Sequence, residues 1–579
     1  AERRLRRVLA IDARRPIAYG RLHDLLQERG DDQGLLKLVN NRIDLVDDPE
    51  ELVGLFYEQA RLHRALGLRE EALGALDNLL MLDSHHLGGL ALLVELQVQN
   101  ENWAGAVEAL RSLAAADDVP ASQRRIARLG AADFLDTRLG NVEGALAELT
   151  ALHEGGLADL EIYERMATVA ERLGNYDTAV EALEHAVEHA PSAAVVARLE
   201  RRAAGIHHAG RSDHDAAVIA YRRALTASPT DVNSGQALAE ILDEAGRVEH
   251  SRRFEQHVRN ALAKAPTDAK LLRRLAKAAS WRDDAGLQTA VLGVLVALDL
   301  ATDDERQAWE LGRFPTLPRG TIDDASLALL STPGLGAPPV RLAMALAESA
   351  AEMDGLEPGG FGFGRNDQVK DETQLKVELR AFTMMFGLPA PDLFSGGSQP
   401  ALLDIAPMYK GKPTWMTGAD VQAPLSDDRR FTVGWLAVGV RLGVAPFVRR
   451  GPEGAALALF AAADAAEIPL AAGEGRDVAD AKRRMYKAMP RRVRKSLPDI
   501  VKLLGDNGES IDAWTHELAR TAHRAGLLAA NDPATALRRV LGTEPGPELV
   551  EQSEDALDLL FFWLSPGCIG LRQKLGLSA

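Results

Sequence analysis

Residues 162–191 read IYERMATVAERLGNYDTAVEALEHAVEHAP, and the segments on either side repeat their pattern. Apolar residues recur every three or four positions in two blocks, which predicts two short amphipathic helices. Gly174 and Asn175 lie between the blocks and predict a tight turn, because glycine ends a helix without Cβ strain and asparagine tolerates left-handed backbone geometry. Pro191 ends the second helix. One helix pair cannot bury its apolar faces alone, so this stretch predicts neighbours of the same kind.

A small residue is expected where the two helices of a pair cross, and Ala179 has this position in the central stretch. Neighbouring segments place an alanine at the corresponding position, and successive alanines lie 34, 39, 34 and 38 residues apart: Ala72, Ala106, Ala145, Ala179 and Ala217. A further segment ends at Pro266. The unit resembles the tetratricopeptide repeat (TPR), whose period is about 34 residues. This resemblance implies a mostly α fold with a TPR-like α-solenoid over residues 1–310.

Length and composition limit the classes of protein that this chain can represent. A chain of 579 residues is too long for one hydrophobic core and normally divides into two or more domains. The formal net charge of −17 disfavours a nucleic-acid coat and suits a soluble scaffold. A single cysteine, Cys568, excludes an internal disulfide framework and a multi-cysteine zinc site.

No apolar run is long enough to span a bilayer. The nearest candidate, LDLLFFWLSPGCIGL, is interrupted by Pro566 and predicts a core helix with a broken end. The chain begins without methionine inside AERRLRRVLAIDARRP, which resembles the second helix of a repeat. We therefore expect a fragment of a longer protein or a processed product, and we expect a cytoplasmic location.

The composition changes after residue 310. Proline and glycine are dense in residues 311–365, which we expect to be a connector with one helix, VRLAMALAESAAEMDG. Residues 366–579 are expected to form a second, smaller α-rich domain. In it, PDLFSGG, PALLDIAP and PTWMTG predict a small sheet, and LSDDRRFTVGWLAVGVRLG predicts a helix capped by Ser426. The remainder reads as helical, with breaks at Pro490 and Pro498.

The order of elements in residues 366–579 resembles that of the gluzincin metallopeptidases, the family of prenyl-protein and heat-shock membrane endopeptidases. In that family the capped helix carries H-E-x-x-H, whose histidines bind zinc and whose glutamate activates water. Here this motif falls on Trp435 to Gly439, and the motif of the third ligand falls on residues 521–526, where Thr521 replaces the ligand glutamate. A catalytic zinc needs three protein ligands. The resemblance therefore implies a degenerate peptidase domain, a pseudoenzyme without zinc.

Two other interpretations of this domain stay open. The domain is a generic α-rich module if the short motifs match by chance. It is a hydrolase if a metal site lies elsewhere, and the candidates for such a site are His516, Glu517 and His523. Their spacing does not favour this, because the two histidines are two helical turns apart instead of one.

The leading hypothesis is a non-catalytic scaffold or adaptor, whose solenoid binds a protein or peptide and whose degenerate domain serves binding or assembly. No cofactor, metal or nucleic acid is predicted as a ligand. The first helix of each repeat is expected to present the partner-binding face. By their position in the repeat, seven residues are expected to lie on it: Tyr57, Arg61, Arg64, Glu161, Glu164, Thr168 and Glu171.

The histidine pairs are expected to be solvated. His185 and His189 lie one turn apart, but no third metal ligand is near them in the sequence. The pairs His85–His86 and His207–His208 lie next to repeat turns and are also expected to be exposed.

The stretch AKRRMYKAMPRRVRKSLPD is the electrostatic exception in this acidic chain, because residues 482–495 contain basic residues and no acid. A third hypothesis is therefore an anion-binding adaptor. The alternative is that these side chains are solvated or pair within the molecule, since charge alone decides partners poorly. The eight basic residues are Lys482, Arg483, Arg484, Lys487, Arg491, Arg492, Arg494 and Lys495.

Overall fold

The computed structural model describes residues 1–313, 317–468, 470, 478–504 and 509–578. The chain is mostly α-helical, and its described residues include a three-stranded sheet. It divides into two compact units, unit 1 (Ala1–Leu242) and unit 2 (Asp243–Ala579). The predicted fold class, a helical solenoid followed by an α-rich part with a small sheet, is confirmed.

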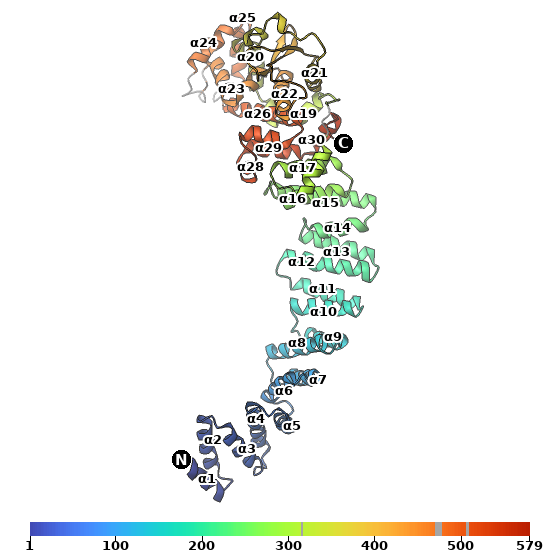
Figure 1. The fold of residues 1–579 in the computed structure, drawn as a ribbon, viewed down its shortest axis with the longest axis vertical. Coiled ribbons are helices and arrows are strands. Elements are labelled where there is room, and N and C mark those ends of the chain that lie inside the picture. The colour runs from blue at the N-terminus through green and yellow to red at the C-terminus, as the bar shows by residue number, and fades with distance from the viewer. Residues whose placement is uncertain (314–316, 469, 471–477, 505–508, 579) are drawn as a thin grey trace. The chain divides into compact units, whose positions relative to one another are not determined.

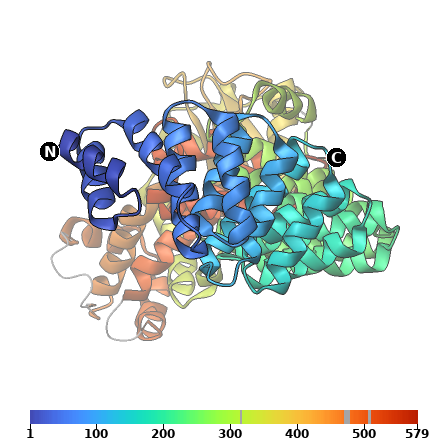
Figure 2. The same ribbon diagram turned by 90° about the horizontal axis from the view of Figure 1, so that it is seen from below.

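Unit 1 is a stack of short helices joined in hairpins, and these helices lie side by side in both views (Figure 1 and Figure 2). Its elements are α1 (Glu2–Ile11), α2 (Pro16–Glu28), α3 (Asp32–Ile43), α4 (Pro49–Ala65), α5 (Arg69–Leu82), α6 (Leu87–Gln99), α7 (Trp103–Ala115), α8 (Ala121–Thr137), α9 (Val142–Glu154), α10 (Leu160–Arg172), α11 (Tyr176–Glu188), α12 (Ala193–Gly205), the π-helical turn η1 (Ile206–Gly210), α13 (His214–Ala227) and α14 (Val232–Ile241).

The turns inside several hairpins of unit 1 share one arrangement. Between α10 and α11, Gly174 has a φ of 71°, and the next residue, Asn175, accepts a hydrogen bond from the Thr178 N–H through its side chain. The predicted turn is thus confirmed, although Asn175 is the N-cap of α11 and not a left-handed residue. The same order, a residue with positive φ followed by an Asn or Asp cap, recurs at Glu101–Asn102, Gly140–Asn141 and Ser212–Asp213.

The predicted crossing residues lie in the core of unit 1. All five alanines have an exposed fraction of 1% or less: Ala72, Ala106, Ala145, Ala179 and Ala217. One apolar cluster runs without interruption from Val107 in α7 to Ile206 after α12. Each helix pair therefore buries its apolar face against the next pair, which is the packing of a solenoid.

Unit 2 contains the remaining helices and the sheet. Its elements are α15 (Glu244–Leu262), α16 (Ala269–Ser280), α17 (Ala285–Ala297), α18 (Asp303–Gly312), α19 (Asp324–Leu330), η2 (Pro333–Gly336), α20 (Pro339–Met353), η3 (Pro358–Phe361), η4 (Arg365–Asp367), α21 (Gln374–Met385), β1 (Asp392–Ser395), β2 (Leu403–Tyr409), β3 (Lys412–Thr417), α22 (Asp427–Arg441), α23 (Ala445–Ala465), α24 (Ala479–Ala488), α25 (Arg491–Lys502), α26 (Glu509–Ala530), α27 (Pro533–Leu541), α28 (Pro547–Gln552), α29 (Glu554–Trp563) and α30 (Pro566–Lys574).

The boundary between the units lies inside the range that the sequence assigned to repeats, residues 1–310. The hairpin α16–α17 has the repeat turn, with a positive φ at Asp283 and a cap at Asp284. Its second helix nevertheless packs against C-terminal helices, because Trp563 Nε1 donates a hydrogen bond to the Ala290 carbonyl over 2.9 Å. A Cβ at Gly293 would lie 2.9 Å from the Trp309 ring. These contacts place α16–α18 in unit 2, while the end of the repeats at residue 310 stays a prediction.

The range 311–365 differs from the connector with one helix that the sequence predicted. It contains α19 besides α20, and Leu330, Leu342 and Leu346 are fully buried in unit 2. The prediction for the proline breaks is half right. Pro490 precedes α25 as its N-cap, whereas Pro498 lies inside that helix.

The sheet has the strand order β1–β3–β2, with β1 parallel and β2 antiparallel to the central strand β3. Lys410 and Gly411 join β2 to β3 and both have positive φ, 51° and 80°, as a two-residue hairpin turn requires. Trp415 in β3 is fully buried and donates a hydrogen bond from Nε1 to Thr383 Oγ1 over 2.9 Å. This bond joins the sheet to α21, and the three strands lie in the segments where a small sheet was predicted.

Among the described residues, no single helix is both long and apolar enough to cross a membrane. The pair α22 and α23 reaches the necessary length and composition together, with a bend of 99° between its two helices.

Candidate interaction surfaces

The predicted partner-binding residues on the first helices of unit 1 are held in contacts within the chain. Arg64 Nη2 lies 2.5 Å from Glu95 Oε1, and Glu164 pairs with Arg198. Arg202 donates hydrogen bonds to Glu171 over 2.8 Å and to Thr168 over 2.9 Å. These predicted residues therefore lie where the first helices of neighbouring repeats contact each other.

These contacts repeat along unit 1, and we name them the arginine ladder. Each pair joins an arginine to a carboxylate 31 to 36 residues away, which is one repeat: Arg64–Glu95, Arg165–Asp133, Arg172–Asp136, Arg198–Glu164 and Arg202–Glu171. All are partly exposed, so each contributes no more than about 1 kcal/mol. The ladder therefore neutralises the first-helix face more than it stabilises it.

The other predicted residues on this face also have neighbours. The Arg61 guanidinium lies over the Tyr57 ring at 5.9 Å from its centroid, and the Tyr57 ring lies 4.9 Å from the His86 ring. Glu161 lies 3.8 Å from Arg125. Their role in binding a partner stays a prediction.

A groove of about 880 Å³ lies on the other side of the same repeats, between the second helices α9 and α11. We name it the second-helix groove. Met166 in α10 and Leu173 at the C-cap of that helix contribute apolar surface to it, and Thr150 and Thr178 contribute hydroxyl groups. This groove was not predicted from the sequence.

Three exposed carboxylates line the second-helix groove, namely Glu143, Glu154 and Glu181. Within the part of the chain that the structure describes, none of them forms an ion pair, and no lysine or arginine lines the groove. The first-helix face thus carries paired charges, whereas this groove carries an unbalanced negative charge.

Two histidines that line this groove, His153 and His185, belong to a cluster with Tyr163. His153 Nδ1 lies 3.0 Å from the Tyr163 hydroxyl, and the His185 ring lies 4.8 Å from the His153 ring and 5.3 Å from the Tyr163 ring. His189 lies 5.3 Å from the same tyrosine ring. Burial raises the pKa of Tyr163. The predicted solvated face is therefore corrected for His185, which is partly covered because it stacks on Tyr163.

Of the other histidine pairs, His85 is exposed as predicted, whereas His86, His207 and His208 are partly or fully buried. His207 is 7% exposed, and burial lowers its pKa. His86 is partly buried and caps α6, since its Nδ1 accepts a hydrogen bond from the Gly89 N–H.

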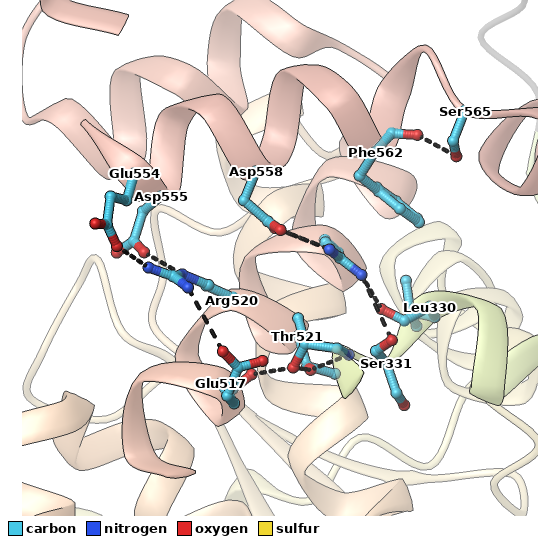
Figure 3. Close-up of polar contacts among 12 residues, drawn as sticks. Leu330, Ser331, Glu517, Arg520, Thr521, Glu554, Asp555, Asp558, Phe562 and Ser565 are labelled. Carbon is cyan, nitrogen blue, oxygen red and sulfur yellow. Dashed lines mark hydrogen bonds and ion pairs between the residues drawn. The ribbon is translucent and has the colours of Figure 1, made fainter. Parts of the chain in front are cut away.

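The positions that correspond to the zinc ligands have structural contacts in unit 2. A Cβ at Gly439 would lie 3.0 Å from the Ala445 Cα and from Val448, so this position is closed by α23. Thr521 is fully buried, and its hydroxyl accepts a hydrogen bond from the Thr332 N–H over 3.1 Å (Figure 3). Trp435 is partly buried on α22.

Arginines on the same helix, α26, bind α29 as Figure 3 shows. Arg524 forms two hydrogen bonds to Asp558, over 2.8 and 2.5 Å. Arg520 binds Asp555 over 2.8 Å and Glu554 over 2.7 Å. This surface of α26 is thus a packing surface that joins two helices of unit 2.

The alternative hydrolase site does not assemble among the described contacts. His516 is exposed, and Glu517 lies 3.5 Å from Arg520. His523 stacks on Phe431 with 6.4 Å between ring centroids, and burial lowers its pKa. No described contact joins these three side chains, and the described residues contain no group of three or more potential ligands placed to hold a metal.

The basic stretch forms α24 and the start of α25. Lys482 pairs with Asp464 over 3.0 Å, Arg483 pairs with Asp480 over 3.1 Å, and Arg494 stacks on Tyr486. The remaining five basic residues form no ion pair with any described residue: Arg484, Lys487, Arg491, Arg492 and Lys495. The last three line a shallow hollow of about 550 Å³ together with Ser496 and Asp499.

Comparison with known protein families identifies the central hairpin. Residues 160–192, which include α10 and α11, match the family Tetratricopeptide repeat. This segment is a TPR. The predicted repeat type is therefore confirmed for the stretch from which it was inferred, and the helix pairs of unit 1 give the solenoid around it. A search of curated proteins finds no match for the chain.

Solved TPR structures resemble parts of the chain. A TPR protein from Parabacteroides merdae is 19% identical, with 42% of this chain and 91% of that chain covered and a TM-score of 0.21. YrrB, a TPR protein with an unusual peptide-binding site, is 18% identical, with 34% and 96% covered and a TM-score of 0.23. TTC0263 from Thermus thermophilus is 20% identical, with 38% and 95% covered and a TM-score of 0.16.

Proposed function

We propose that this chain is a non-catalytic protein-binding scaffold, and that unit 1 binds a cationic segment of a partner polypeptide in the second-helix groove. The observation that supports this most is the charge difference between two faces of the same repeats. Carboxylates on the first-helix face are paired with arginines one repeat away, whereas Glu143, Glu154 and Glu181 around the groove have no described ion pair. Complementary charge favours a partner that brings lysine or arginine.

The volume of the groove is large enough for one side chain of a peptide and the residues next to it. About 880 Å³ lies within the range of small-ligand sites, and apolar surface from Met166 and Leu173 lies beside the carboxylates. A lysine or arginine side chain can place its methylene groups on this apolar surface and its charge at a glutamate. The His153–Tyr163–His185 stack would give such a cation an aromatic wall.

The test captures the partner at a defined position of the full chain. A photo-crosslinking amino acid replaces the exposed groove residue Ala147, or replaces Glu161 on the first-helix face, in the cells that make the protein. We expect an adduct from position 147 that disappears when Glu143, Glu154 and Glu181 are changed to glutamine. Adducts from position 161 alone would show that the partner binds the predicted first-helix face and not the groove. No adduct from either position would contradict partner binding by these repeats.

The degenerate-peptidase interpretation of residues 366–579 belongs to the same proposal, with this domain serving binding or assembly. It is supported by the order helix, sheet, Ser426-capped helix and later helix. It is also supported by close packing of α22 on α26, since a Cβ at Gly434 would lie 2.4 Å from the Ala525 carbonyl oxygen. Metal analysis of the purified chain tests it: we expect well under one zinc per chain, and stoichiometric zinc would contradict it.

A second candidate function, anion binding by α24 and α25, is favoured by the five basic side chains without a described ion pair. Binding of a polyanion would weaken steeply with salt, because each lysine or arginine that pairs with one of its charges releases a condensed counterion from it. We expect heparin, used as a polyanion probe, to bind the full chain and to bind less after Arg491→Gln, Arg492→Gln and Lys495→Gln. A heparin affinity that changes neither with salt concentration nor with these substitutions would exclude this function.

A further inference from the structure

A second groove of about 880 Å³ lies in unit 2, and we name it the methionine groove. One side is the exposed face of α20, the second is the turn between β2 and β3, and the third is the junction of α22 and α23. The three helices are labelled in Figure 1. All three belong to the same compact unit.

The floor of the methionine groove is made of small residues. Ala347 and Ala351 lie one turn apart on α20, Gly355 follows the end of that helix, and Gly443 also lines the groove. Small side chains allow the backbone of an occupant to approach closely, as they do where helices cross. The floor is therefore shaped for a helix or another regular element and not for a single side chain.

Two methionines stand at the rim. Met344 is 55% exposed and Met408 is 66% exposed, and both line the groove. The flexible thioether of methionine adapts to apolar side chains of different shapes. Met344 and Met408 therefore give the groove an adaptable apolar rim.

The charge at the groove is negative. Glu348, Glu352 and Glu357 line it, all three are exposed, and none forms an ion pair within the described part of the chain. The basic lining residue Lys410 lies over the Tyr409 ring at 5.0 Å. An occupant with an apolar stripe and basic flanks would match both the floor and the charge.

Strand addition to the edge strand β2 is less favourable than helix binding. Pro407 has no backbone N–H, and the Ile405 N–H donates to the Asp404 carboxylate over 2.8 Å. Arg449 holds the same carboxylate through a hydrogen bond of 2.7 Å. The backbone donors that an added strand needs are thus absent or occupied at these positions.

We propose that the methionine groove binds a basic amphipathic helix of a partner protein. Its apolar residues lie on the alanine and glycine floor between Met344 and Met408, and its lysine or arginine side chains lie against Glu348, Glu352 and Glu357. This site is separate from the second-helix groove of unit 1, and neither proposal depends on the other.

The probe is a synthetic 18-residue peptide with leucines at helical spacing, lysines on both flanks and a benzophenone group on its apolar face. A matched peptide has glutamate in place of each lysine. Binding is measured by fluorescence anisotropy on the full chain and again on the chain with Glu143→Gln, Glu154→Gln and Glu181→Gln, so that any binding at the groove of unit 1 is removed. We expect the lysine peptide to bind both proteins and the glutamate peptide to bind neither.

Two changes test the location. Glu348→Lys with Glu352→Lys reverses charges at the groove, and we expect at least a tenfold weaker affinity. Glu453→Lys with Glu548→Lys makes the same change of net charge at exposed positions outside it, and we expect no more than a twofold change. Ala351→Trp fills the floor without any change of charge and should also abolish binding, with circular dichroism as the check on folding.

Photo-crosslinking gives an independent readout, because benzophenone reacts readily with methionine. Mass spectrometry of the adduct should place the peptide on Met344 or Met408. No binding by the unchanged chain, equal loss in the Glu453/Glu548 control, or adducts at other positions only would each overturn the proposal.

Discussion

The hairpins α10–α11 in unit 1 and α16–α17 in unit 2 begin with the same local chemistry and end in different environments. Both turns place a residue with positive φ before a capping side chain, Gly174 before Asn175 and Asp283 before Asp284. The second helix α11 alternates buried and exposed residues, whereas nearly every residue of α17 after its first turn is buried or partly buried. The turn is thus a local property, and the burial of the second helix depends on what packs behind it.

The difference also concerns the range of the contacts. In unit 1 each helix packs against helices near it in the sequence, so stability is approximately a sum over neighbouring repeats. In unit 2, α17 contacts α27 and α30, which lie more than 230 residues later. The loss of stability caused by a core substitution is therefore expected to stay local in unit 1 and to spread through unit 2.

The largest expected effect separates the units directly. Trp563 is fully buried, donates to the Ala290 carbonyl and has Arg572 over its ring at 4.1 Å. Trp563→Ala should reduce the unfolding free energy of unit 2 by about 3–5 kcal/mol. Hydrogen exchange of the full chain should show lost protection throughout residues 243–579 and unchanged protection in residues 1–242. Loss confined to α29 and α17 would mean that unit 2 does not unfold cooperatively.

A smaller, local effect is expected at the crossing in unit 1. Ala179→Leu forces a larger side chain between α10 and α11, where the exposed fraction is zero, and should cost about 1–3 kcal/mol. Protection from hydrogen exchange should fall in α10, α11 and the adjacent hairpins. Ala147→Leu, at an exposed position of the neighbouring second helix, is the matched control and should change little. Equal losses in both variants would contradict the assignment of the crossing.

Substitution of the N-cap residue compares the two hairpins at equivalent positions. Asn175→Ala and Asp284→Ala each remove a side-chain acceptor from the first turn of a helix, at a cost of about 1 kcal/mol. Asp284 also pairs with Arg282 over 3.0 Å, so its loss should cost slightly more. Urea unfolding of the two variants measures the difference. A negligible cost for both would show that the shared turn does not depend on its cap.

The smallest effect is a dependence on pH. A hydrogen bond from Arg273 lowers the pKa of Glu305 from 4.5 to about 2. Since the folded pKa is below the unfolded one, the stabilisation is present above pH 4.5 and is lost as the pH falls towards 2. The pair is partly exposed, so its contribution stays below about 1 kcal/mol. Glu305→Gln should therefore be less stable than the unchanged chain at pH 7 and equally stable near pH 2. A difference that does not change with pH would contradict this ion pair.

Several features were predictable because they depend on residues close together in the chain. The spacing of Ala72, Ala106, Ala145, Ala179 and Ala217 indicated the repeats, and each of these alanines is buried. The strands followed from short apolar segments between turn residues, and the capped helix followed from Ser426. The sequence AGLQTAVLGVLVA of α17 also held a signal that was not used, since a helix that is apolar on all sides is a buried one.

The candidate sites were less predictable. The first-helix residues Glu164 and Glu171 were expected to be available to a partner, but their arginine partners come from the next repeat and are visible only in the folded stack. The second-helix groove exists because α9 and α11 are separated in space, and the spacing of residues in the sequence does not reveal that separation. The methionine groove joins residues 344, 408 and 443, whose proximity comes from the packing of three elements.

The sequence by itself determined the helices, their turns and the crossing alanines, because propensity, capping and periodic burial act over fewer than about 40 residues. Only the tertiary structure decided where unit 1 ends, which carboxylates are neutralised and which hollows remain open. Those properties depend on contacts between segments that are up to hundreds of residues apart, such as Trp563 with Ala290. Such long-range packing decides which of the similar helical hairpins belong to the repeat stack of unit 1 and which are buried in unit 2.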